Sequence, residues 1–240
     1  MKCVIFCAGR GVRLSEKTSE IPKPLLEIGE KPIVERIMDH YVNYGVRDFV
    51  LCLGYLGNKI SDYFNRKNTG YNVVTVDTGE NSTKAERLMR VKNLLDYEFF
   101  VAYGDDLSNV DIEKLLEFHK KEKRISTLTA VKLPSAYGTL ELHEYEPNLV
   151  SSFREKPLIR EWINGGYFVF DKKIFDYISK DDELEKEVFS KLIKDRQLAA
   201  YRHAGFWKSM NTLKDHIELN DMFKRGELEC VVSGGRKNEQ

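Results

Sequence analysis

A glycine-rich segment near the N-terminus carries residue types that bind polyphosphates. The apolar run Cys3–Cys7 leads into a loop with glycines at positions 9 and 11, and a Lys-Pro pair follows at Lys23. Glycines let the backbone approach phosphate oxygens and turn N–H groups toward them, while fixed cations neutralise the phosphate charge. A lone Gly-x-Gly is common in ordinary turns, so the added cations are what favour a phosphate-binding loop. These cations are Arg10, Arg13 and Lys23.

A second candidate is the acidic pair Asp105 and Asp106, which follows Gly104 and the apolar run Phe99–Tyr103. Carboxylates at the C-terminal end of a strand lie where open α/β sheets bind ligands. An isolated pair of aspartates more often caps the following loop. The pair alone therefore leaves both interpretations open.

Two later segments complete the set of candidates. Phe153–Pro157 contains Arg-Glu-Lys-Pro, and Trp162–Tyr167 contains Asn-Gly-Gly and leads toward Phe206–Asn211. Taken singly, lysines are usually solvated, Asn-Gly-Gly is typical of a turn, and Phe-Trp is typical of a core. Because independent loops seldom supply all of these features in one order, the four segments together predict a single site.

The elements that must position these segments follow an α/β pattern. Short apolar runs alternate with helical periodicity through the first half, which is typical of βαβ units and a mostly parallel sheet. The expected strands there are Lys2–Phe6, Phe49–Leu53, Asn72–Val76 and Phe99–Tyr103, and the expected helices are Pro32–Tyr44, Lys59–Asn65 and Glu86–Leu95. In the second half we expect a helix over Asp111–Lys123, strands over Ser126–Val131, Thr139–His143, Val150–Arg154 and Tyr167–Phe170, and helices over Leu184–Lys194 and Thr212–Lys224. The clustered strands of the second half predict that the sheet becomes mixed.

Composition limits the function classes. The 240 residues include 38 basic and 38 acidic side chains, so no net field attracts nucleic acid or an anionic membrane. No stretch approaches the roughly 20 apolar residues of a membrane helix, and a cytoplasmic protein is expected. We predict one domain over residues 1–232 and a disordered, glycine-rich tail over 233–240. The four cysteines lack paired spacing, and His119 and His203 show no acid–base partner, so all six are interpreted as structural.

Taken together, the chain resembles the sugar 1-phosphate nucleotidyltransferases from residue 1 to about residue 224, most closely the glucose-1-phosphate cytidylyltransferases. The stretches that carry this resemblance are Val50–Tyr55, Tyr103–Asp105, Trp162–Gly166, Ala200–His203 and Gly205–Trp207. The resemblance implies a Rossmann-like nucleotidyltransferase fold with a mixed, mostly parallel sheet flanked by helices. It also implies that a sugar-phosphate oxygen attacks the α-phosphorus of a nucleoside triphosphate and that magnesium pyrophosphate leaves. Such chemistry needs mainly alignment and charge neutralisation.

The same resemblance implies a role for each matching residue. Arg13 would hold the leaving pyrophosphate, and Lys23 would contact the α-phosphoryl group. The nucleotide would lie against Ala8, Gly9, Gly11, Gly54, Tyr55 and Arg87. The acceptor would be bound by Lys156 at its phosphate, by Glu155 and Asn164 at its hydroxyls, and by backbone N–H groups of Gly138 and Gly165. Asp105 and the residue at position 211 would bind Mg²⁺, which prefers oxygen ligands.

The chain departs from the family pattern at several positions. The family has Asp where this chain has Asn211, and Asn coordinates metal through its carbonyl oxygen but brings no charge. Asp106, where the family has Gly, offers a replacement carboxylate. Val12 stands in place of Thr, and Ala85-Glu86 in place of Gly-Gly. The segment between Phe64 and Val73 is shorter than expected, so a homo-oligomer stays an open alternative.

We therefore expect a cytidylyltransferase that acts on CTP and a phosphorylated sugar or related small phosphate, with no nucleic-acid or membrane partner. One rival keeps the chemistry with UTP, dTTP or GTP. The other is a nucleotide- or sugar-phosphate-binding protein that has lost catalysis. Asn211 and Glu86 favour that second rival, while Lys23, Asp105 and Lys156 oppose it.

Overall fold

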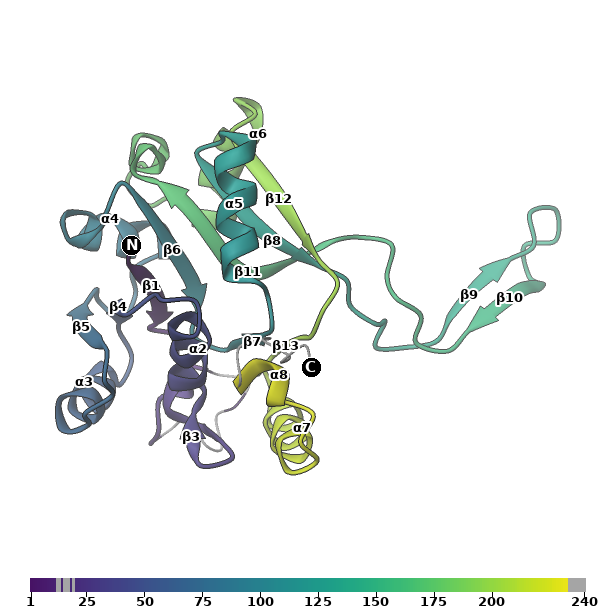
Figure 1. Cartoon of the computed structure of the whole chain (residues 1–240). Coiled ribbons are helices and arrows are strands. Elements are labelled where there is room, and N and C mark those ends of the chain that lie inside the picture. Colours follow the sequence, from purple (N-terminus) through teal and green to yellow (C-terminus); the bar gives the residue numbers. More distant parts are fainter. Residues whose placement is uncertain (12–13, 15–17, 19, 233–240) are drawn as a thin grey trace, which may run out of the picture.

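A seven-stranded sheet organises the molecule (Figure 1), with strand order β12-β8-β11-β6-β1-β4-β5. The structure is a computed structural model that describes residues 1–11, 14, 18 and 20–232, so the predictions for Val12, for Arg13 and for the tail 233–240 lie outside the described residues. The strands of the sheet are β1 (Cys3–Cys7), β4 (Asp48–Leu53), β5 (Asn72–Asp77), β6 (Glu98–Tyr103), β8 (Ser126–Val131), β11 (Ile163–Asp171) and β12 (Leu198–His203). Within this sheet β11 pairs antiparallel with β6 and β8, and the other pairings are parallel. The predicted mixed, mostly parallel sheet is confirmed.

Helices pack on both faces of the sheet because its central strands are apolar on both sides. In β1 the alternate residues Cys3, Ile5 and Cys7 face one core cluster, while Val4 and Phe6 face a second. The first cluster includes residues of α2 (Ile33–Val42), α3 (Gly57–Arg66), α5 (Ile112–Glu122), α7 (Leu213–Lys224) and α8 (Glu229–Val232). The second includes residues of α4 (Lys84–Val91), the π-helical turn Leu184–Val188 and α6 (Phe189–Lys194). Among the described residues, no helix is long and apolar enough to cross a membrane.

In the described part of the chain, three small two-stranded sheets lie outside the central one. β2 (Glu27–Ile28) pairs with β3 (Lys31–Pro32), and β7 (Asp106–Ser108) pairs with β13 (Trp207–Ser209). The third is the hairpin of β9 (Thr139–Leu142) and β10 (Val150–Arg154), which projects away from the body of the molecule in Figure 1. Residues 134–158, which include this hairpin and the segments on either side of it, are called the arm. The sequence predicted both arm strands but assigned them to the main sheet, and that assignment is wrong.

Candidate active site

A cavity of about 690 Å³ opens at the C-terminal ends of β1 and β6. Its wall combines the loop after β1, the start of α4, the end of β6, the start of β11 and strand β13. Segments that are far apart in the sequence thus meet where the strand-end pattern indicated a ligand site. The predicted site residues that line this cavity are Ala8, Gly9, Gly11, Lys23, Arg87, Asp105, Asn164 and Asn211.

Two glycines are required for the strand ends to meet at this cavity. A Cβ at Gly104 would lie 2.6 Å from the backbone oxygen of Phe6, which leaves no room for any side chain. Gly166 has a φ of +72° and lies in an irregularity of the β11–β8 pairing. A Cβ there would collide with the ring of Tyr103. Asn-Gly-Gly is therefore a bulge-like irregularity within β11, and not the turn that its sequence suggests in isolation. Irregularities of this kind change the direction of side chains beside active sites.

Lys23, Asp105 and Asn211 form a contiguous polar group in the cavity. The ammonium of Lys23 is ion-paired with Asp105 and lies 3.3 Å from Oδ1 of Asn211. Asn211 donates from Nδ2 to Ser209 Oγ at 2.8 Å, which turns its carbonyl oxygen toward Lys23. A cationic group thus already lies between the two oxygens predicted to bind Mg²⁺. An all-oxygen donor set of this kind suits a hard divalent cation.

Asp106 differs from its neighbour Asp105 in its surroundings. Its side chain is buried at the start of β7, and burial together with the nearby charge of Asp105 raises its pKa well above the usual range. In the metal-free protein this favours the neutral carboxyl. Without a metal ion, Asp106 therefore adds little negative charge beside Asn211, and its role as a replacement carboxylate for bound Mg²⁺ stays a prediction.

A chain of polar contacts runs from Asn164 of β11 through Tyr103 of β6 to Glu185 and Lys84. Asn164 donates to the hydroxyl of Tyr103 at 3.1 Å and accepts from the backbone N–H of Gly166 at 3.0 Å. The Tyr103 hydroxyl donates in turn to Glu185, which is ion-paired with Lys84 at 2.6 Å. Tyr103, Lys84 and Glu185 were not predicted, because nothing in their local sequence distinguishes them from core or surface residues. Gly165 lies beside this group, and its carbonyl oxygen accepts from the indole N–H of Trp207 at 2.7 Å.

Arg87 is buried and holds the loop that follows β5. Its guanidinium donates to the backbone oxygens of Leu53, Gly79 and Glu80 at 3.2, 2.7 and 3.1 Å. It therefore shapes the cavity wall through backbone carbonyls, which sequence alone could not reveal. Gly54 and Tyr55 follow Leu53 beside this wall, and the N–H of Tyr55 donates to the carbonyl of Ala8 at 3.3 Å.

Glu86 has a structural task next to Arg87. Thr83 and Glu86 form a capping box at the start of α4, and the Glu86 carboxylate accepts from the backbone N–H of Thr83 at 3.0 Å. The box satisfies two backbone N–H groups that the first turn of a helix leaves open. This departure from the family pattern is thus explained by helix capping.

Three predicted acceptor-binding residues are not brought into the cavity. Gly138, Glu155 and Lys156 lie on the arm, where a Cβ at Gly138 would come within 3.0 Å of the Glu155 carboxylate. Both charged side chains are exposed. The arm joins the body next to Leu133, which lines the cavity and accepts at its carbonyl from the N–H of Ile159 at 2.9 Å.

The histidines and cysteines were expected to have structural roles only, and the structure agrees for some of them. The expectation that His119 lacks an acid–base partner is wrong, because its Nε2 lies 3.3 Å from Oδ1 of Asp171. His203 contacts Ser108 Oγ at 3.3 Å and the Phe206 carbonyl at 3.2 Å. Cys7 reaches the cavity wall, but burial raises the pKa of its thiol, which disfavours the nucleophilic thiolate.

Comparisons with known proteins agree with the geometry. A family model described as nucleotidyl transferase matches residues 2–225. The chain is 38% identical over 251 residues to a probable glucose-1-phosphate cytidylyltransferase of Bacillus subtilis (strain 168), covering 95% of this chain and 98% of the relative. It is 36% identical to the glucose-1-phosphate cytidylyltransferase of Salmonella typhi, covering 95% and 97%. It is 30% identical to the mannose-1-phosphate guanyltransferase of Saccharomyces cerevisiae, covering 94% and 66%. The crystal structure of HddC from Yersinia pseudotuberculosis superposes with a TM-score of 0.72 at 23% identity, covering 92% of this chain and 99% of that one.

Proposed function

Since the chain belongs to the nucleotidyl transferase family, we propose that it transfers a cytidylyl group from CTP to a sugar 1-phosphate and releases pyrophosphate. The observation that carries this proposal is the position of Lys23 between Asp105 and Asn211 in a cavity at the carboxyl edge of the sheet. The choice of cytosine and of a sugar 1-phosphate rests on the similarity to two glucose-1-phosphate cytidylyltransferases along almost the whole chain.

In the proposed reaction, an oxygen of the acceptor phosphate forms a bond to the α-phosphorus of CTP. The bond from that phosphorus to the bridging oxygen breaks, and pyrophosphate carries away the electron pair. The ammonium of Lys23 leaves Asp105 and neutralises the charge that develops on the α-phosphoryl oxygens. The N–H groups around Gly9 and Gly11 contact the triphosphate, and Arg13 holds the leaving group.

Asp105 and the carbonyl oxygen of Asn211 are the residues that would hold Mg²⁺ beside the triphosphate. The ion would offset phosphate charge during the displacement. One protein carboxylate and one neutral oxygen leave most of its coordination to phosphate and water, as is usual for Mg²⁺ at phosphate-transfer sites.

The acceptor half of the site depends on the arm. Asn164 lines the cavity and Gly165 follows it in β11, and we assign the acceptor phosphate to Lys156 and a sugar hydroxyl to Glu155. Because Glu155 and Lys156 lie on the arm, the arm must either bend onto the cavity of its own chain or reach the cavity of a second copy of the chain. Mixing inactive Lys23→Ala and Lys156→Ala chains distinguishes the two routes, since activity returns only if arms act between copies.

The test of the function is pyrophosphate release from each of four nucleoside triphosphates with a panel of sugar phosphates, using Lys23→Ala as the inactive control. We expect the highest kcat/KM with CTP and a hexose 1-phosphate. Cytosine presents an amino donor where uracil presents a carbonyl acceptor, so a site matched to one leaves polar groups unpaired with the other. Equal kcat/KM for CTP and UTP would refute the base assignment.

The alternative function, a binding protein without catalysis, was favoured by two residues, and the structure explains one of them. Glu86 is occupied in capping α4, so its carboxylate is not evidence of a disabled nucleotide site. Asn211 alone still favours that rival. Tight binding of CTP without pyrophosphate release from any substrate pair would support it against the proposed function.

A further inference from the structure

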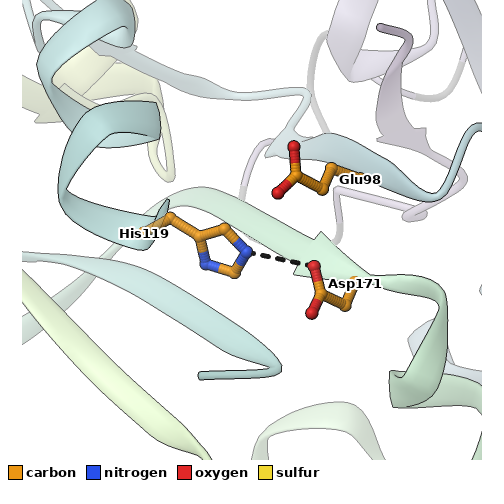
Figure 2. Close-up of side chains that lie close together, drawn as sticks. All are labelled: Glu98, His119 and Asp171. Atoms are coloured by element: carbon orange, nitrogen blue, oxygen red, sulfur yellow. Dashed lines mark hydrogen bonds and ion pairs between the residues drawn. The ribbon is translucent and has the colours of Figure 1, made fainter. Parts of the chain in front are cut away.

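A cluster of metal-ligating residue types, drawn in Figure 2, lies at the end of β6 that is remote from the cavity. Glu98 begins β6, Asp171 ends the antiparallel strand β11, and His119 projects toward them from α5. One ligand atom from each of the three residues lies within 4.8 Å of the others. Since β6 runs from Glu98 to the cavity at Tyr103, the cluster is separate from the proposed active site.

The imidazole of His119 is oriented as in a metal ligand. Its side chain is only 2% exposed, and Nδ1 lies 2.9 Å from the hydroxyl oxygen of Thr127. With an ion bound, Nδ1–H would donate to that oxygen and Nε2 would present its lone pair to the ion between the two carboxylates. Histidines that bind metals almost always have the other ring nitrogen held by such a partner.

The separation of His119 and Asp171 suits an ion held between them. Nε2 of His119 lies 3.3 Å from Oδ1 of Asp171, which is long for a direct N–H···O hydrogen bond. Atoms bound to a tetrahedral ion at about 2.0–2.2 Å lie about 3.3–3.6 Å from each other. The 3.3 Å from His119 Nε2 to Asp171 Oδ1 equals the distance between two ligand atoms that are bound to the same tetrahedral ion.

Charge and access favour the same interpretation. Two carboxylates share this site, and among the described residues the only lysine or arginine within 4.0 Å of either is Lys120, which lies 3.9 Å from Glu98 and is 57% exposed. The side chains of Glu98 and Asp171 are 31% and 18% exposed, so a hydrated ion can enter from solvent. A divalent ion would balance both carboxylates from a central position.

We propose that Glu98, His119 and Asp171 bind a divalent first-row transition metal ion, with Zn²⁺ as the best match. One imidazole nitrogen and two carboxylate oxygens suit Zn²⁺, whereas Mg²⁺ prefers oxygen alone. Water completes the coordination. The ion joins α5 to the outer ends of β6 and β11, so it stabilises the fold at a distance from the reaction.

The test is Zn²⁺ binding to the full chain by calorimetry, with excess Mg²⁺ present to occupy the active site, together with the Zn²⁺-induced rise in Tm. We expect one Zn²⁺ per chain and a higher Tm for the wild type, and loss of both in His119→Gln, Asp171→Asn and Glu98→Gln. Thr127→Val should weaken binding by about 10-fold because it removes the partner of Nδ1. Lys120→Gln should strengthen binding because it removes a competing cation. The matched control is His216→Gln, because His216 lies on α7, away from the cluster, and contacts the carbonyl of Glu27 in β2.

If His119 and Asp171 form only a hydrogen bond and bind no metal, the same measurements give different results. The proposal is overturned if the wild type binds no Zn²⁺, or if Glu98→Gln and Asp171→Asn bind it as tightly as the control does. These two variants replace partly exposed side chains, so they decide the matter even if His119→Gln fails to fold. Because the readouts are affinity and Tm, they stand independently of pyrophosphate release.

Discussion

Replacing Asn211 with Asp should lower the magnesium concentration needed for half-maximal rate. The substitution puts a carboxylate where Oδ1 of Asn211 now faces the ammonium of Lys23 at 3.3 Å, next to Asp105. It therefore adds one negative charge at the proposed metal site with almost no change in shape.

The magnitude is worked for a bound cation at the distance from Oδ1 of residue 211 at which the Lys23 ammonium now lies. Two unit charges 3.3 Å apart interact by about 1.3 kcal/mol in water and about 5 kcal/mol at an effective dielectric of about 20. Asn211 is half-buried, and bound phosphates and solvent ions screen the new charge, so the lower end applies. A gain of about 1.4 kcal/mol corresponds to about a 10-fold lower magnesium requirement.

The assay is the rate of pyrophosphate release against magnesium concentration at saturating CTP and acceptor. Asn65→Asp adds the same charge at an exposed position on α3 and controls for net charge. Asp105→Asn should raise the magnesium requirement sharply or abolish turnover.

An unchanged magnesium requirement in both Asn211→Asp and Asp105→Asn would refute the metal-site assignment. A higher KM for the acceptor in Asn211→Asp, with the metal requirement unchanged, would instead place the amide of Asn211 against the acceptor. An amide donates a hydrogen bond there that an ionised carboxylate does not.

Three further predictions concern other parts of the molecule. Lys23→Ala should lower kcat by about 100-fold or more while the thermal transition stays intact, and near-normal kcat would refute its role. Glu86→Ala should lower the free energy of unfolding by about 1 kcal/mol through loss of the capping box, without changing the preference among nucleotides; a changed preference would show that Glu86 acts on the base. Burial lowers the pKa of His40 from 6.5 to about 4, so between these values the unfolded chain binds a proton that the folded protein does not. Stability should fall by about 3 kcal/mol as pH drops through that window, and urea unfolding of His40→Gln should show a smaller fall; equal falls in both proteins would contradict this.

Local patterns predicted most of the fold because the strands that line the core are strongly apolar. Ser126–Val131 and Val150–Arg154 were predicted with their observed bounds. β12 was not predicted as a strand, because Leu198–His203 is an edge strand with two alanines, which have low β propensity. β7 and β13 are three residues each, too short for a period-2 pattern to be evident.

The candidate site was predictable where it depends on strand ends. Asp105, Asn164 and Asn211 reach one cavity because the topology brings their elements to the same edge of the sheet. The position of the arm was not predictable, since a two-stranded hairpin has no sheet partner that fixes its place. The pair of His119 and Asp171 spans 52 residues and exists only through the packing of α5 on the sheet.

The reversed strand β11 has a consequence for how the molecule opens. β6 and β8 do not pair with each other, so β11 is the only hydrogen-bonded connection between the β5-β4-β1-β6 ribbon and the β8-β12 ribbon of the described sheet. Breaking the hydrogen bonds of β11 would divide the sheet into two separate ribbons. Both the cavity wall and the cluster of Glu98, His119 and Asp171 would be lost in the same event. In native-state hydrogen exchange, the central amides of β11 should therefore exchange only with global unfolding, whereas those of the arm should exchange at near-random-coil rates.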